Sequence, residues 1–147
     1  MASDFRTSEG TDGHATRRRL AAAVAAPAVI GAGLGLRTVA TGDVAKYGGD
    51  ALYTLLVLAL VVLVAPRMTP PRATGVALAV SWGIEFLQLT GLPAQLARHS
   101  TVAPLVLGST FNAPDLFWYV VGAAVGLLVM SGCVAPRRNA SLGETDT

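Results

Sequence analysis

One carboxylate stands inside an apolar run that is otherwise long enough to cross a membrane. Glu85 is the only charged residue between Ala73 and Leu92, and at about 1.5 Å per residue it lies roughly 10 Å from the end of that run. An ionisable group at such a depth costs about 3 kcal/mol or more unless it faces a partner or water. Ser81 and Gln88 share its helical face at i, i+4, i+7 spacing. The sequence therefore predicts an inward-facing polar stripe.

Other charged and polar residues lie at the ends of the neighbouring apolar runs. If those runs form antiparallel helices, these ends meet Glu85 at one face of the membrane. Isolated charges would be poorly solvated there, so we expect them to gather. The predicted binding or structural polar cluster comprises Lys46, Asp50, Glu85, Gln88, Arg98 and Asp115.

Several uses of this cluster remain open at this point. An internal ion-pair network would fix helix register, for instance by pairing Glu85 with Arg98. The same network would pair Asp50 with Lys46. Alternatively, Arg98 and Lys46 would hold a polar or anionic headgroup or solute. Glu85 and Asp115 could also act as a catalytic acid and base, or the cluster could pass ions or protons; we assign no catalytic residue.

The composition indicates a membrane protein. The 147 residues are 52% hydrophobic and 14% charged, with a mean hydropathy of +0.55, whereas a soluble domain carries about 25% charged residues. A net charge of +2 gives no indication of nucleic acid as a partner.

His99 is the only imidazole near the cluster and no metal-ligand spacing surrounds it, so no metal and no cofactor are predicted. The single Cys133 is interpreted as a buried apolar residue.

Four apolar runs predict an all-α integral membrane protein, a bundle of four transmembrane helices. The polar segments 1–16 and 137–147 are expected to be disordered tails, and His14 in the first of them is given no role. The connection between the third and fourth helices, the last outer loop, is expected to hold a short interfacial or re-entrant segment. Whether residues 102–108 of this connection enter the bilayer is left open. The transmembrane domain spans residues 17–136, with helices at about 20–36, 50–66, 73–91 and 115–134.

The first apolar run allows two interpretations. Arg17-Arg18-Arg19 loosely resembles a twin-arginine export signal, and Thr38-Val39-Ala40 resembles a cleavage site. Three further apolar runs favour a retained helix instead. Small residues would let the helices approach closely; those expected to do so are Gly31, Gly35, Gly122 and Gly126.

The distribution of Lys and Arg predicts the orientation. Eight of the eleven lie before the first apolar run, in the middle turn or after the last run: Arg6, Arg17, Arg18, Arg19, Arg67, Arg72, Arg137 and Arg138. The other three, Arg37, Lys46 and Arg98, lie in the other two connections. Because positive loops stay inside, both termini are expected in the cytoplasm and the polar cluster at the outer face.

A series of motifs runs in order from about Arg37 to Gly126. It consists of Lys46–Leu52, Ile84–Leu89, Arg98, Leu105–Gly108, Phe111, and Asp115–Leu116 with Tyr119 and Gly122. This series resembles a bacterial membrane family catalogued as domain of unknown function 2809. The part from Glu85 onward resembles the VanZ-like membrane proteins more distantly; there an Asn usually stands in place of Tyr119. The nearer family commonly has a Trp before the Arg, which is missing here. The resemblance implies a multi-pass protein of the bacterial cytoplasmic membrane and supplies no activity.

Three functions follow from these features. The preferred one is a non-enzymatic, envelope-associated binding or accessory protein whose outer cluster engages a lipid headgroup, a cell-wall precursor or a partner protein. One alternative is a membrane-embedded enzyme that acts on a lipid-linked substrate through Glu85 and Asp115. The other is an oligomeric small-solute transporter or channel. The missing Ser-His pattern, metal motif and phosphate loop disfavour the enzyme. Expected partners are the bilayer and either further copies or another membrane protein.

Overall fold

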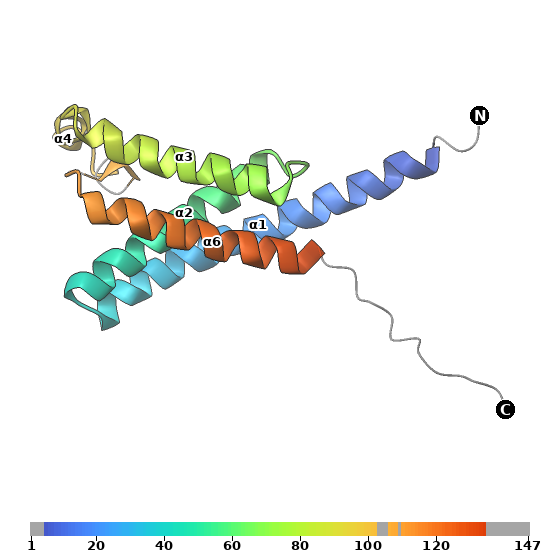
Figure 1. The fold of residues 1–147 in the computed structure, drawn as a ribbon, viewed down its shortest axis with the longest axis horizontal. Helices are drawn as coiled ribbons and strands as arrows, with labels where there is room; N and C mark the ends of the chain where they lie inside the picture. The colour runs from blue at the N-terminus through green and yellow to red at the C-terminus, as the bar shows by residue number, and fades with distance from the viewer. Residues whose placement is uncertain (1–4, 103–105, 109, 135–147) are drawn as a thin grey trace.

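The computed structural model describes residues 5–102, 106–108 and 110–134, and this part of the chain is helical and contains no strand (Figure 1). The long helices are α1 (Phe5–Val39), α2 (Gly42–Val64), α3 (Pro70–Gln88) and α6 (Ala113–Val134), and α4 (Leu92–Ala97) is a short helix that follows α3. The predicted all-α class is confirmed.

Three of these helices contain stretches long and apolar enough to cross a membrane. The stretches are Gly13–Val39, Gly42–Val64 and Ala113–Gly132. Membrane-type helices are therefore confirmed. Among the described residues α3 does not reach this apolarity, because its 19 residues include Arg72, Glu85 and Gln88. The fourth span therefore stays a prediction.

Helix α2 occupies the centre of the packing. It contacts α1, α3 and α6, and α3 also packs against α6, whereas α1 packs against α2 alone among the described helices. The apolar core includes Leu58 and Val62 of α2 and Ala73 and Ala77 of α3. In the apolar stretch of α1 only 6% of the residues are buried, against 28% in the apolar stretches of α2 and of α6. α1 is therefore the peripheral helix.

Two glycines allow α6 to lie close to α2. A Cβ atom at Gly122 would overlap the backbone carbonyl of Ala51, and one at Gly126 would overlap the Leu58 side chain. By contrast, Gly31 and Gly35 of α1 have open space around them. Of these four glycines, the two on α6 therefore lie at a close helix contact.

The helices begin earlier than the sequence predicts. α1 starts at Phe5, within the segment expected to be a disordered tail, because extending a formed helix adds one hydrogen bond per residue. α2 starts at Gly42 rather than near residue 50, which places Lys46 and Asp50 on one helical turn. α3 starts at Pro70, since proline is tolerated in the first turn of a helix. The expected tail 137–147 lies outside the described residues.

The two ends of the bundle differ in what they hold. Figure 1 shows the end of α3, α4, the start of α6 and the α1–α2 connection together on the left; we call this the α4 end. The turn Ala65–Thr69 between α2 and α3 lies at the opposite end, the turn end. Helix α1 runs past the turn end toward its N-terminus (Figure 1).

Candidate functional site

Glu85 is enclosed at the α4 end, with 1% of its surface exposed. The Tyr119 hydroxyl donates to its Oε2 at 3.0 Å, and the backbone N–H of Asn112 donates to its Oε1 at 2.6 Å. Both carboxylate oxygens therefore have donors, as a buried charged group requires. These bonds connect α3 to α6 and to the segment that precedes α6.

Lys46 forms the second part of the cluster, between α2 and the start of α6. Its ammonium contacts the Asp115 carboxylate and lies 3.7 Å from Oδ2 of Asp50. The Asn112 side-chain amide also donates to Asp115, so Asn112 bridges the Glu85 and Asp115 carboxylates. The side chain of Lys46 is 42% exposed, against 19% for Asp50 and 9% for Asp115. Lys46 is thus the most exposed of these three side chains.

Among the described residues, an oxygen of Asp50 lacks a hydrogen-bond donor. Oδ2 of Asp50 is buried without a hydrogen-bond partner among the described residues, although the Lys46 ammonium lies nearby. Two carboxylates therefore share one cation.

Gln88 holds the segment before α6 against α3. Its Nε2 donates to the Leu107 carbonyl at 2.8 Å, and the Tyr53 hydroxyl donates to the Val106 carbonyl at 2.9 Å. Gly108 has a φ of 64°, and a Cβ atom there would crowd the Gln88 amide. Gln88 therefore has a positioning role. Residues 103–105 of this connection lie outside the described residues.

Arg98 stands apart from the others. It caps the C-terminal end of α4 and is exposed. The expected pairing of Glu85 with Arg98 is wrong: in the part of the chain that the structure describes, Glu85 is hydrogen-bonded to Tyr119 and Asn112 instead. The reason is that α4 carries Arg98 to the surface while Glu85 faces inward. The expected contact of Lys46 with Asp50 is present.

Two stacked aromatic rings lie beside Lys46. Tyr47 and Trp118 stack with centroids 5.4 Å apart, and the Lys46 ammonium lies 5.2 Å from the Tyr47 centroid. Within the described ranges, no group of three or more His, Cys, Asp or Glu side chains could hold a metal ion. The exposed charged group of the cluster is therefore the Lys46 ammonium, which lies against the Tyr47 ring.

Sequence reasoning missed two residues of this site. Tyr119 was noted as part of the family motifs but was not placed in the cluster, yet it is buried and donates to Glu85. Its position four residues after Asp115, on the same face of α6, was the available signal. Asn112 gave no signal, because it bonds Glu85 through its backbone.

The fold and the site together define an all-helical protein with membrane-type helices and a buried polar cluster at one end. A family model described as "Protein of unknown function (DUF2809)" matches residues 39–123, and the chain belongs to this family. The matched part contains every residue of the predicted cluster. No curated protein and no solved structure matches the chain.

Proposed function

We propose that the chain is a non-enzymatic binding or accessory protein of the bacterial cytoplasmic membrane. In this proposal α1, α2, α3 and α6 all cross the bilayer, both termini are cytoplasmic, and the α4 end faces outward. The Lys46 side of the cluster binds the polar headgroup of a lipid or of a lipid-linked cell-wall precursor.

The packing of α3 supports its role as a fourth span. Its 19 residues would extend about 28 Å, close to the thickness of the hydrocarbon core. It lies against α2 and α6, and its one deep acid is enclosed by hydrogen-bond donors. The excess of Lys and Arg in the tails and in the α2–α3 turn supports the orientation.

The contrast in exposure between Glu85 and Lys46 carries the functional proposal. A general acid or base must come within hydrogen-bond reach of its substrate. Glu85 is 1% exposed with both oxygens occupied, so the geometry favours positioning over catalysis. Lys46 is accessible in the same cluster and lies beside an aromatic pair. An exposed ammonium beside stacked rings suits a headgroup rich in hydroxyl or phosphate oxygens.

A comparison of copurifying lipids tests the proposal. Wild type, Lys46→Gln and Arg98→Gln are purified and their bound lipids and solutes identified by mass spectrometry. Both variants remove one positive charge from the α4 end, but only Lys46 contacts the cluster. We expect a headgroup class that is enriched with wild type and Arg98→Gln and is lost with Lys46→Gln. Identical profiles for all three proteins would contradict headgroup binding at this site.

A reporter fused after Ser100 tests the orientation. The connection that contains α4 should read as external, because α4 lies at the end with fewer Lys and Arg residues. A cytoplasmic signal at this position would overturn the proposed orientation and the outward-facing cluster.

A further inference from the structure

An apolar groove runs along the side of the bundle between α1 and α6, with α2 as its floor. Its volume is about 680 Å³, within the range of about 300–1,000 Å³ that ligand pockets occupy. Small or apolar side chains line it, including Ala22 and Ala25 of α1, Leu58 and Val62 of α2, and Gly126 and Met130 of α6. It exists because α1 packs on α2 and leaves α6 uncovered on that side.

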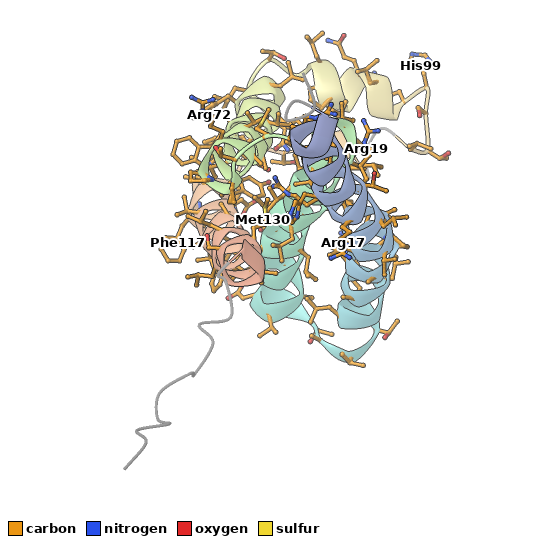
Figure 2. All side chains as sticks on the ribbon, turned by 90° about the vertical axis from the view of Figure 1, so that its right-hand side faces the viewer. Arg17, Arg19, Arg72, His99, Phe117 and Met130 are labelled. Carbon is orange, nitrogen blue, oxygen red and sulfur yellow. The ribbon has the colours of Figure 1, made fainter. Side chains whose placement is uncertain are left out.

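Basic side chains stand at the turn end of this groove. His14, Arg17 and Arg18 belong to its lining, and all three precede the apolar part of α1. Figure 2 views the bundle from this side, with Arg17 on α1 and Met130 on α6. A second cavity of about 290 Å³ shares His14 and Arg18 and also borders Arg67. The apolar groove thus continues into a cationic pocket.

Arg18 is fixed by the protein but is not fully satisfied. Its Nη1 donates to the Met68 carbonyl at 2.8 Å, which holds α1 against the α2–α3 turn. Its Nη2 is buried and has no hydrogen-bond partner among the described residues. An enclosed guanidinium N–H without an acceptor is costly, and a phosphate oxygen accepts strong, charge-assisted hydrogen bonds from arginine.

We propose that this groove binds one anionic phospholipid. Its phosphate contacts Arg17 and Arg18, and an acyl chain lies along Ala25 and Gly126. A second copy of the chain is a less favourable occupant than an anionic lipid. A parallel copy would bring its own arginines to the same end, where the positive charges would repel each other. Basic pockets between membrane helices on the cytoplasmic side are suited to anionic headgroups. The site is separate from the headgroup site proposed at the α4 end, so either proposal can fail alone.

Native mass spectrometry of the full chain in detergent tests the headgroup contact. Dioleoyl phosphatidylglycerol and dioleoyl phosphatidylcholine are titrated separately. We expect phosphatidylglycerol to bind wild type about tenfold more tightly, and Arg17→Gln/Arg18→Gln to lose this preference. The matched control Arg37→Gln/Arg98→Gln removes two charges at the α4 end and should keep the preference for phosphatidylglycerol. Equal binding of the two lipids, or equal loss in both double variants, would overturn the proposal.

A single substitution guards against misfolding of the double variant. Arg17 is exposed, so Arg17→Gln should fold normally. We expect it to lower the preference about threefold, since one of two charge-assisted contacts is lost. An unchanged preference in a folded Arg17→Gln protein would place the phosphate elsewhere and overturn the assignment.

A matched pair of substitutions on α1 tests the acyl-chain contact. Ala25→Phe fills the groove, whereas Ala23→Phe adds the same bulk at an exposed position outside its lining. Ala25→Phe should weaken phosphatidylglycerol binding at least fivefold and Ala23→Phe should leave it unchanged. If Ala25→Phe instead dissociates a dimer and lipid binding is unaffected, a second copy occupies the groove and the proposal is wrong.

Discussion

The α4 end and the turn end both carry charged groups, but they use them differently. At the α4 end, Glu85 and Asp115 are buried and hydrogen-bonded across three helices. At the turn end, Arg18 and Arg19 donate to the carbonyls of Met68 and Leu63. Arg17 and Arg18 also line the groove.

The difference follows from where each helix packs. α2, α3 and α6 enclose the α4 end from three sides, so a charge there must find its partner inside the protein. Among the described helices α1 packs on α2 alone, and its basic residues border a cavity. The buried carboxylates at the α4 end therefore hold helices together, whereas His14 and Arg17 at the turn end stay exposed beside the groove.

The largest effect is expected when Glu85 loses both of its acceptor oxygens. Glu85→Leu leaves the Tyr119 hydroxyl and the Asn112 N–H without acceptors and should destabilise the protein by about 4 kcal/mol. The measurement is the free energy of unfolding in mixed detergent micelles. Adding Tyr119→Phe should recover part of this loss, whereas adding Arg98→Gln should recover none. Rescue by Arg98→Gln would mean that Glu85 is paired with Arg98 after all.

A slightly smaller effect is expected from closing the gap between α2 and α6. Gly122→Ala places a methyl group against the Ala51 carbonyl and should cost about 3 kcal/mol. Gly132→Ala, on the same helix with open space around it, should be neutral or stabilising by up to about 1 kcal/mol. Equal stability of the two variants would show that α6 does not approach α2 at Gly122.

Removing the accessible cation of the cluster should have an intermediate effect. Lys46→Gln leaves Asp50 and Asp115 facing each other without a counter-charge. We expect a loss of about 1–2 kcal/mol, reduced by the partial exposure of Lys46. Arg98→Gln should change stability little, since Arg98 is exposed. A larger loss for Arg98→Gln would place Arg98 within the cluster.

The smallest effect concerns the polar contact in the middle of the bundle. Thr54 donates to Ser81 at 3.3 Å, and both side chains are fully buried. Thr54→Val keeps the shape and should cost about 0.6 kcal/mol, the average for a hydrogen bond between membrane helices. A cost comparable to that of Glu85→Leu would mean that the stabilising polar contacts are not concentrated at the α4 end.

The sequence predicts the helical class and much of the cluster because long apolar runs and helical spacing are local properties. Lys46, Asp50, Glu85 and Asp115 come together since antiparallel helices bring their ends to one face. The wrong partner for Glu85 arose from pairing opposite charges. A tyrosine hydroxyl and a backbone N–H satisfy the carboxylate equally well, and charge does not reveal them.

The groove could not be predicted in the same way. Its existence depends on the side of α2 against which α1 packs, which is a tertiary choice rather than a periodic pattern. His14, Arg17 and Arg18 were interpreted as tail and flanking residues, because their continuation into α1 is not apparent from composition. The paired arginine contacts with Met68 and Leu63 are visible only in the folded chain.

The peripheral attachment of α1 makes the molecule modular. The family match covers residues 39–123 and begins where α1 ends, so the matched part holds the α4-end cluster but, of the groove lining, only the α2 residues. A relative that lacked a counterpart of this helix would keep the polar cluster and present a flat, lipid-facing surface instead of a groove. The proposed lipid site at the turn end can therefore diverge without disturbing the polar cluster at the α4 end.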